Sequence, residues 1–183
     1  MKKILFLNGS PRKKGNTSAL INLLQQKLNT STFQTDLEFL YNYEIKPCVD
    51  CRGCKKGTLE CVLKDDMPVI YTKINAADYL VFGTPIYWFG PTAKMKLLID
   101  RFRPYYANKN LKNKKGILLF AAGSGEEDTD LTLEMYRRVF SALEMTFITY
   151  LSTKAYDEND VYEDDNAIYG IEKLAELLNN SIN

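Results

Sequence analysis

All four cysteines of the 183-residue chain lie in one short stretch, as Cys48, Cys51, Cys54 and Cys61. In a reducing compartment, such crowding indicates metal or redox chemistry before structural disulfides. Zinc ribbons usually bring together two separated Cys-x2-Cys pairs. A Cys-x2-Cys-x2-Cys run is instead the ferredoxin-like spacing that folds around one iron–sulfur cluster. The pattern therefore favours an iron–sulfur site, and it leaves open a zinc site on all four thiolates, or free thiols and a labile disulfide.

Glycines and basic residues in and beside this stretch fit a soft-metal site. Gly53 and Gly57 supply the backbone freedom that wrapping around a metal centre requires. A thiolate-ligated cluster carries negative charge, and five basic side chains could offset it: Lys46, Arg52, Lys55, Lys56 and Lys64.

A second candidate site is the loop from Asn8 to Ser18, which follows a short apolar run. It contains two glycines, small hydroxyl residues and three consecutive basic residues, and a helical pattern begins at its end. Free N–H groups and the positive end of a helix dipole favour a phosphate at such a place. The loop lacks the Walker A lysine, which Asn16 replaces, and it lacks the G-x-G-x-x-G spacing. We predict a phosphate site of another kind; the alternative is a solvated turn that Thr17 or Ser18 caps.

Three consecutive aromatic residues lie between two prolines in residues 84–91, Thr84-Pro85-Ile86-Tyr87-Trp88-Phe89-Gly90-Pro91. A loop cannot bury all three rings in a core, and the prolines stiffen it. Such a segment suits the wall of a site for a flat aromatic ligand. The alternative, strongest for Trp88, is a dimer contact or a plug in the core.

The elements that must position these segments alternate between strand-like and helix-like patterns. We expect strands at residues 3–7, 36–40, 79–82, 116–122 and 146–151, and helices at residues 17–28, 65–75, 92–102, 131–143 and 167–178. Strands that alternate with helices form a parallel sheet with right-handed crossovers and helices on both faces. The prediction is a single three-layer α/β domain over residues 1–183, with a cysteine-rich insertion at about residues 41–64. Ligands then bind beyond the carboxyl ends of the strands.

Composition excludes several kinds of function. The chain has 24 basic and 23 acidic residues, and this balance predicts neither a nucleic-acid nor a membrane partner. Histidine is absent, which excludes Ser-His-Asp and Cys-His catalysis and histidine-ligated zinc. The N-terminal apolar run is too short for a signal peptide, and the longest apolar run, residues 117–122, is far too short to span a bilayer. We expect a soluble, cytoplasmic protein.

Two acidic runs complete the set of charged segments. Residues 126–130 and residues 157–165 each precede or enter a predicted helix, where carboxylates favour the positive end of the dipole. Neither has the spacing of a calcium-binding EF-hand loop, so we assign them no chemistry.

Two of these segments together resemble a known family. The first is Asn8-Gly9-Ser10-Pro11-Arg12 with Gly15-Asn16-Thr17-Ser18, and the second is Gly83-Thr84-Pro85-Ile86-Tyr87-Trp88 with Pro91, Lys94 and Leu98-Ile99-Asp100-Arg101. Over about residues 1–125, this pairing is similar to the flavodoxin-like NAD(P)H-dependent FMN reductase family. The resemblance implies a doubly wound, five-stranded parallel sheet in the order 2-1-3-4-5, and bound FMN.

The resemblance also implies which residues bind the flavin. The phosphate would be held by residues of the first loop: Ser10, Arg12, Asn16, Thr17 and Ser18. The isoalloxazine would be bordered by residues of the second loop: Pro85, Ile86, Tyr87, Trp88 and Phe89. A third loop would contribute Gly123 and Ser124, although its sequence differs from the family's Thr-Gly-Gly type. Lys94, Asp100 and Arg101 are interpreted as structural or interface residues on a helix surface.

The cysteine run resembles the compact motif of the iron–sulfur flavoproteins within this family. That branch implies a 4Fe-4S cluster on Cys48, Cys51, Cys54 and Cys61, and homodimers or homotetramers that bring cluster and FMN together. The expected function is an FMN-dependent oxidoreductase that passes electrons from NADH or NADPH through FMN, with or without the cluster, to a quinone, a flavin or a one-electron acceptor. Flavin N5 carries that chemistry, so no catalytic side chain is assigned. The alternatives are a flavodoxin-type electron carrier and a zinc or thiol redox-sensing module.

Overall fold

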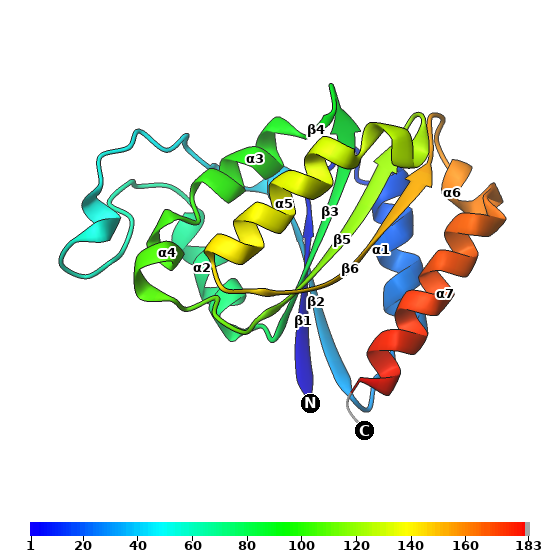
Figure 1. The fold of residues 1–183 in the computed structure, drawn as a ribbon, viewed down its shortest axis with the longest axis horizontal. Coiled ribbons are helices and arrows are strands. Elements are labelled where there is room, and N and C mark those ends of the chain that lie inside the picture. The colour runs from blue at the N-terminus through cyan, green and yellow to red at the C-terminus, as the bar shows by residue number, and fades with distance from the viewer. Residues whose placement is uncertain (182–183) are drawn as a thin grey trace.

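Five parallel strands form the central sheet of the computed structural model, which describes residues 1–181 (Figure 1). In spatial order they are β2 (Phe33–Phe39), β1 (Lys2–Asn8), β3 (Tyr79–Tyr87), β5 (Lys115–Ala122) and β6 (Thr146–Lys154). Counted without the two-residue strand β4 (Gly90–Pro91), this is the expected order 2-1-3-4-5. The strand order changes direction between β1 and β3, which is where ligands bind in sheets of this kind.

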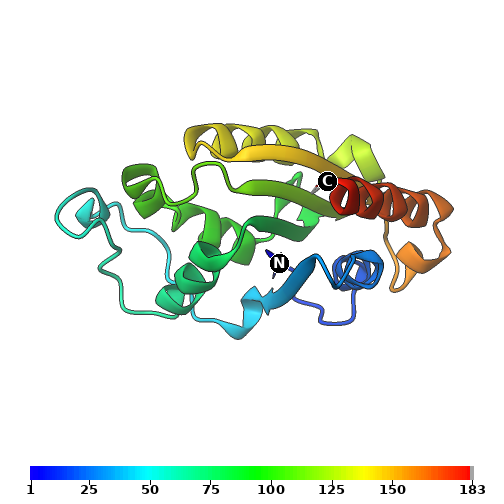
Figure 2. The same ribbon diagram turned by 90° about the horizontal axis from the view of Figure 1, so that it is seen from below.

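Helices cover both faces of the sheet (Figures 1 and 2). One face carries α1 (Asn16–Lys27) and α7 (Asp165–Asn180), with the short α6 (Asp160–Glu163) beside them. The other side carries α2 (Met67–Ala76), α3 (Ala93–Asp100), α4 (Arg103–Asn108) and α5 (Asp130–Ala142). The expected three-layer, doubly wound α/β fold is confirmed.

Two apolar cores, one on each face, account for the unbroken apolar runs of the central strands. In β1, Ile4 and Phe6 belong to the core under α1 and α7, while Leu5 and Leu7 belong to the core under α2, α3 and α5. Side chains alternate between the two faces of a strand, so a strand covered on both sides is apolar at every position. Each such side chain contributes about 1.5–3 kcal/mol on burial. These strands are therefore a firm platform for the loops that follow them.

Strand β3 is longer than the sequence pattern predicts. The pattern ends at Phe82 because glycine and proline follow, but β3 continues to Tyr87, and Pro85 stays in register with Ala121 of β5. Past the residues that pair with β5, the end of β3 pairs antiparallel with β4 (Gly90–Pro91). This hairpin was not predicted from the sequence. Glycine and proline are local signals for the end of a strand. They do not predict this extension, because it depends on pairing with β5, which is distant in the sequence.

The helix predicted at residues 92–102 is two helices in the structure. α3 ends at Asp100, and α4 begins at Arg103 with Pro104 in its first turn. Proline is tolerated there because the first N–H groups of a helix have no partner within it. The break leaves Arg101 between the two helices, where it is buried. The other predicted elements start and end within about three residues of the expected positions.

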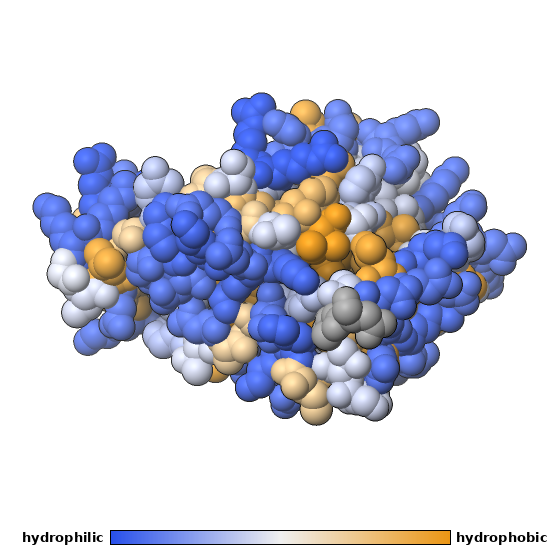
Figure 3. Space-filling view, turned by 60° about the horizontal axis from the view of Figure 1, so that its bottom comes forward, coloured by the Kyte–Doolittle hydropathy of each residue, from blue (hydrophilic) through white to orange (hydrophobic). Residues whose placement is uncertain are grey.

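Among residues 1–181, no helix combines the length and the apolar character that crossing a bilayer requires. Seen from the side where the strands begin, most of the surface is hydrophilic, and apolar side chains gather in a patch near its middle (Figure 3). The edge strand β6 is half-buried along most of its length, because no further strand covers it. The assignment of all 183 residues to one domain stays a prediction.

We predict that Gly9→Ala destabilises the fold by about 1–3 kcal/mol, the usual cost of overpacking. A Cβ at Gly9 would lie 2.9 Å from the Cβ of Met95 in α3, closer than side chains approach. The loop is held on both sides. The Gly9 N–H donates to the backbone oxygen of Gly83 at 2.8 Å, and the Gly9 oxygen accepts from Thr92 Oγ1 at 2.6 Å. Chemical denaturation measures the effect.

Gly90→Ala in β4 is the matched control. A Cβ there would meet only the backbone oxygens of Tyr87 and Trp88, at 3.7 and 4.0 Å, which is ordinary contact. If Gly9→Ala lowers the free energy of unfolding no more than Gly90→Ala does, the packing argument is wrong.

Candidate functional site

A cleft opens beyond the carboxyl ends of β1, β3 and β5, at the place where the strand order changes direction. Its volume is about 540 Å³, which is within the usual range of sites for cofactors and other small ligands. Four segments line it: the loop after β1, the end of β3, the loop after β5 and the loop after β6. Parallel strands direct their carboxyl ends to one edge of the sheet, so loops that are distant in sequence meet there.

The loop after β1 is held in shape by the buried side chain of Asn8. Its Oδ1 accepts a hydrogen bond from the N–H of Ser10 at 2.8 Å, and its Nδ2 donates to Ser18 Oγ at 2.9 Å. Ser10 Oγ in turn accepts from the N–H of Arg12 at 3.1 Å. Ser18 lies outside the lining, and its hydroxyl ties α1 to Asn8. The predicted phosphate residues that do line the cleft are Ser10, Arg12, Asn16 and Thr17.

The start of α1 carries two buried polar atoms that lack a partner. Gly15 is the N-cap residue, so neither Thr17 nor Ser18 caps the helix. Thr17 Oγ1 and Asn16 Oδ1 are buried and make no hydrogen bond with any residue that the structure describes. Buried polar atoms are nearly always paired, and the free N–H groups of a helix start bind anions. The arrangement suits a ligand that is anionic and carries hydroxyl groups.

The end of β3 forms an apolar and aromatic part of the wall. Pro85, Ile86 and Tyr87 line the cleft at the position where a wall for a flat ligand was predicted. Trp88 and Phe89 lie outside the lining, because they form the two-residue turn between β3 and β4. Trp88 is 95% exposed and is therefore no plug of the core. Both turn residues have positive φ, 50° for Trp88 and 62° for Phe89.

The loop after β5 contributes Gly123 to the lining but not Ser124. The N–H of Ser124 donates to Asp128 Oδ2 at 2.9 Å. Asp128 itself lines the cleft, so its carboxylate shapes this loop and also contributes to the wall.

Acidic residues after β6 also line the cleft, although the sequence analysis assigned them no chemistry. Asp157 and Glu158 lie in this wall together with Tyr156. The backbone oxygen of Asp157 accepts a hydrogen bond from Asn16 Nδ2 at 2.7 Å, which joins the segment to the start of α1. Their place directly after a strand of a parallel sheet is the signal that could have identified them.

The four cysteines line one separate pocket, at the end of the molecule opposite α1 and α7 (Figure 1). Cys54 is buried, Cys48 and Cys61 are half-buried, and Cys51 is exposed. Burial raises the pKa of the Cys54 thiol, and the neighbouring charges of the other three cysteines raise it further. Four thiols around one pocket are a donor set for a soft metal. Within residues 1–181, no three side chains of the metal-binding types stand in a ligating arrangement.

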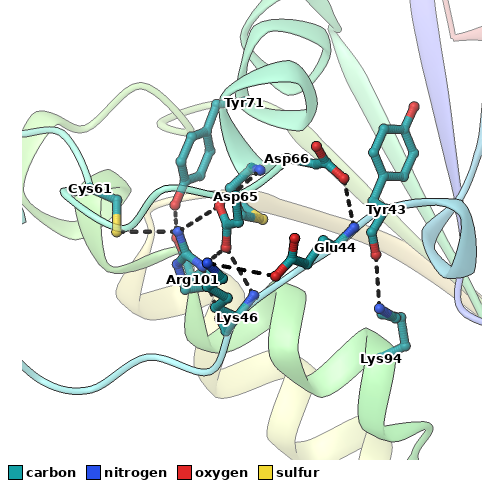
Figure 4. A network of polar contacts seen from close by, with 10 residues as sticks. Tyr43, Glu44, Lys46, Cys61, Asp65, Asp66, Tyr71, Lys94 and Arg101 are labelled. Atoms are coloured by element: carbon teal, nitrogen blue, oxygen red, sulfur yellow. Dashed lines mark hydrogen bonds and ion pairs between the residues drawn. The ribbon is translucent and has the colours of Figure 1, made fainter.

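Arg101 lines this pocket, and its position corrects the interpretation of a helix-surface charge. Its side chain is 1% exposed and forms a buried ion pair with Asp65 (Figure 4). Its Nη2 donates to Cys61 Sγ at 3.3 Å, and its Nη1 donates to the backbone oxygen of Lys46 at 2.8 Å. Burial opposes ionisation of Asp65, but hydrogen bonds from Arg101, Lys46 and Met67 hold its pKa below the ordinary value. A sequence pattern does not distinguish such a residue from a charge on the helix surface.

The other two charged residues of the same motif make polar contacts within the chain, and Asp100 also lines the cysteine pocket. Lys94 Nζ donates to the backbone oxygen of Tyr43 at 2.9 Å. Asp100 forms an ion pair with Lys96 at the surface of α3.

The cleft and the cysteine pocket are separate within one chain. In the part of the chain that the structure describes, no residue lines both of them. The cysteine segment leaves the sheet after β2 and returns at α2, away from the loops that line the cleft (Figures 1 and 2). A single copy of the chain therefore keeps the cysteines apart from the cleft.

The sequence matches a family model described as NADPH-dependent FMN reductase over residues 2–155. The chain belongs to the NADPH-dependent FMN reductase family. It is therefore an oxidoreductase, and the resemblance drawn from the two loops is confirmed. The matched range includes the loops after β1, β3 and β5 and the whole cysteine segment, and it ends just after β6.

Relatives within this family carry names of two kinds. An iron-sulfur flavoprotein of Methanosarcina thermophila is 38% identical over 69% of this chain and 68% of its own length. An iron-sulfur flavoprotein of Methanocaldococcus jannaschii is 30% identical over 75% of this chain and 71% of its own length. A Bacillus subtilis protein named as an NAD(P)H-dependent FMN-containing oxidoreductase is 27% identical over 94% of this chain and 96% of its own.

Solved structures share the fold of this family member at low sequence identity. An NAD(P)H:quinone oxidoreductase from Methanothermobacter marburgensis superposes with a TM-score of 0.70, at 18% identity and over 98% of each chain. The Trp repressor binding protein from Bacillus subtilis superposes with a TM-score of 0.68, at 20% identity, over 93% of this chain and 96% of its own. These likenesses confirm the flavodoxin-like arrangement of sheet and helices.

We predict that W88N/F89G stabilises the ligand-free chain. Both central residues of this turn have positive φ, which Asn and Gly adopt readily and bulky side chains do not. Each strained residue costs on the order of 1 kcal/mol of folding stability. The ring of Trp88 is exposed, so its burial offsets little of this cost. Thermal unfolding measures the change, at about 2–4 °C per kcal/mol for a chain of this size.

W88A/F89A is the control for this turn. It removes both rings but keeps a Cβ at each position of positive φ, so the midpoint should not rise. A midpoint of W88N/F89G no higher than that of W88A/F89A would contradict the assignment of strain.

Proposed function

We propose that this chain is an FMN-dependent oxidoreductase that takes electrons from NADH or NADPH and passes them through FMN to a quinone, a free flavin or a one-electron acceptor. The observation that carries the proposal is the pair of unsatisfied buried atoms at the start of α1, Thr17 Oγ1 and Asn16 Oδ1. Family membership supports FMN as the cofactor, and the cleft is of suitable size. Bound FMN supplies the hydride and electron chemistry, and the protein binds and orients it.

The loop after β1 would hold the phosphate. Free N–H groups at the start of α1 and the helix dipole attract an anion, and Arg12 contributes a positive charge to the same wall. Thr17 Oγ1 can donate to a phosphate oxygen, and Asn16 Oδ1 can accept from a hydroxyl of the ribityl chain. Ser10 and Ser18 support this loop through their hydrogen bonds with Arg12 and Asn8. The loop is thus already shaped before any ligand binds.

The end of β3 would border the isoalloxazine ring. Pro85 and Ile86 contribute apolar surface, and Tyr87 contributes an aromatic face. The proposed set also includes Trp88 and Phe89, whose turn directly follows this wall. The loop after β5 would complete the ring site with Gly123 and Ser124.

We further propose that Cys48, Cys51, Cys54 and Cys61 hold a 4Fe-4S cluster. Their ferredoxin-like spacing, their common pocket and the iron-sulfur flavoprotein names of the relatives support this assignment. Ligation would draw the loop closer together, and Gly57, at a φ of 63°, has a backbone conformation that glycine adopts readily. When bound, the cluster supplies one-electron transfer. Zinc on the same four thiolates is the competing assignment.

The separate linings of the two sites support an assembly of more than one copy. In residues 1–181, none lines both the cleft and the cysteine pocket. We therefore propose a homodimer or homotetramer in which the cysteine loop of one copy approaches the cleft of another. Light scattering on the holoprotein measures this, and a monomer with full activity would contradict it.

We predict that Thr17→Val weakens FMN binding at least tenfold without destabilising the ligand-free chain. Its hydroxyl has no partner within the described residues, so removing it breaks no bond. A hydrogen bond to a charged ligand is worth about 1.5–3 kcal/mol, and about 1.4 kcal/mol corresponds to one factor of ten. Fluorescence titration with FMN and chemical denaturation give the two measurements.

Thr153→Val is the matched control for this prediction. Thr153 is also buried, but it does not line the cleft, and its Oγ1 donates to the backbone oxygen of Phe120 at 3.3 Å. Its loss should lower stability and leave the FMN dissociation constant unchanged. Equal FMN affinity in the wild type and in Thr17→Val would place the phosphate away from α1.

Purification under strict anaerobiosis tests the cofactor content. We expect flavin absorption bands, a broad iron–sulfur absorption and about four iron atoms per chain. Cys54→Ser should remove the iron and spare FMN, because the two sites have separate linings. Flavin with about one zinc and no iron would replace the cluster by a zinc site. A chain that binds no FMN even after addition of the cofactor would overturn the proposed function.

A further inference from the structure

A buried arginine links three parts of the cysteine segment to the body of the fold. Arg101 follows the last turn of α3, and its guanidinium reaches a residue before the cysteines, one of the cysteines and a residue after them (Figure 4). It donates to the backbone oxygen of Lys46 at 2.8 Å and to Cys61 Sγ at 3.3 Å, and it pairs with Asp65. One side chain thus closes the base of the segment and contacts a thiol at the same time.

The surroundings of Arg101 hold this geometry in place. Asp65 accepts hydrogen bonds from the N–H groups of Lys46 at 2.9 Å and Met67 at 3.1 Å, so its carboxylate also joins both ends of the segment. Tyr71 donates its hydroxyl hydrogen bond to the backbone oxygen of Arg101. The side chains of Arg101 and Asp65 are 1% and 0% exposed. The network therefore lies inside the protein, where solvent screens it little.

Stability alone does not account for a buried ion pair at this place. Desolvation of two charges usually offsets their attraction, and apolar residues of similar volume often serve as well or better. The Nε of Arg101 is buried without a partner among the described residues, which adds to that cost. An apolar pair could provide neither the hydrogen bond to the backbone oxygen of Lys46 nor the N–H to Cys61 Sγ, and of these two contacts the second involves a thiol.

Arg101 also differs from the other basic residues of the cysteine pocket. In the described chain, four basic side chains line it, and three of them are solvent-accessible: Arg52, Lys55 and Arg103. Charges in contact with water act weakly on their neighbours, whereas a buried charge acts strongly. Arg101 is thus the basic residue best placed to act on a charged group in the pocket.

We propose that Arg101 is the positioning residue of the cysteine site: it holds Cys61 in the common pocket and places a buried positive charge beside the thiolates of a soft-metal centre. The presence of a metal rests on the proposed function, whereas the contact between Arg101 and Cys61 does not. Hydrogen bonds to ligand sulfurs and nearby charge are among the factors that set the affinity and potential of such centres.

The first test titrates cobalt(II) into the anaerobic, metal-free full chain, because the thiolate-to-cobalt absorption intensity reports the number of bound sulfurs. The main variant is D65N/R101M, which removes the ion pair without leaving a buried charge unpaired and keeps an acceptor at residue 65. We expect four bound sulfurs in the wild type and three in the variant, with affinity about 10–100-fold weaker. Cys61→Ser should lower the number of bound sulfurs and the cobalt affinity by the same amount. Combining it with D65N/R101M should lower neither of them further.

Two further variants separate position from charge. Arg101→Lys keeps a positive charge, but a single ammonium group cannot replace a guanidinium that contacts Lys46, Cys61 and Asp65 together. The cobalt affinity of this variant should therefore stay well below that of the wild type. Lys173→Met removes a surface charge from α7, at the other end of the molecule (Figure 1), and should change nothing. An unchanged FMN dissociation constant in every variant confirms that the fold is intact. The positioning role would be overturned if D65N/R101M bound cobalt through four sulfurs with wild-type affinity, or if Arg101→Lys had full wild-type affinity. Either result would still support a metal site on the cysteines.

The second test needs no metal. Iodoacetamide labelling of each cysteine is followed by mass spectrometry at pH about 9.5, above the ordinary thiol pKa of roughly 8.5, so that accessibility dominates the rates. Loss of the Arg101 contact should raise the rate at Cys61 severalfold relative to Cys51, and Lys173→Met should leave that ratio unchanged. A wild type that binds neither cobalt nor iron would overturn the metal part of the proposed function. An unchanged labelling ratio in D65N/R101M would overturn the hold of Arg101 on Cys61.

Discussion

The parallel pairing of β1 with β3 is the constraint on which the cleft depends. It places the Gly9 N–H 2.8 Å from the backbone oxygen of Gly83, and it brings the loop after β1 beside the end of β3. Thr92 then fastens the same loop to the start of α3 through the backbone oxygen of Gly9. The polar start of α1 and the aromatic end of β3 therefore line one space, although almost seventy residues separate them in the sequence. Both cores stabilise this pairing, since β1 and β3 contribute side chains to each of them.

The cysteine segment follows a different physical principle. Residues 46–65 contribute little to the two cores, with Cys54 as their one buried hydrophobic side chain among the described residues. Polar contacts hold the base of the segment instead, from Arg101 to Lys46, Cys61 and Asp65. A segment anchored at its base but scarcely packed can rearrange around a ligand without disturbing the sheet.

Much of the fold was predictable from sequence because the central strands are buried on both faces. Apolar runs such as residues 117–122 have few alternatives to an interior parallel strand, and amphipathic helices between them complete the pattern. The extension of β3 to Tyr87 and the break after α3 were not predictable, because each depends on partners distant in sequence. The same holds for the cleft. The loops after β1 and β3 carried local signals, whereas Asp128, Asp157 and Glu158 became part of the wall only when β5 and β6 took their places in the sheet.

The sequence by itself determined the kinds of chemistry available: four clustered thiols, a helix start suited to an anion, an aromatic segment, and no histidine. These are properties of residue type and spacing, which need no partner. The tertiary structure alone decided which of these groups meet. It separated the cysteine pocket from the cleft, exposed Trp88 at a strained turn, and buried Arg101 against Cys61 and Asp65. The physical reason is that burial and hydrogen-bond partners come from packing between distant segments, and a local pattern carries no record of that packing.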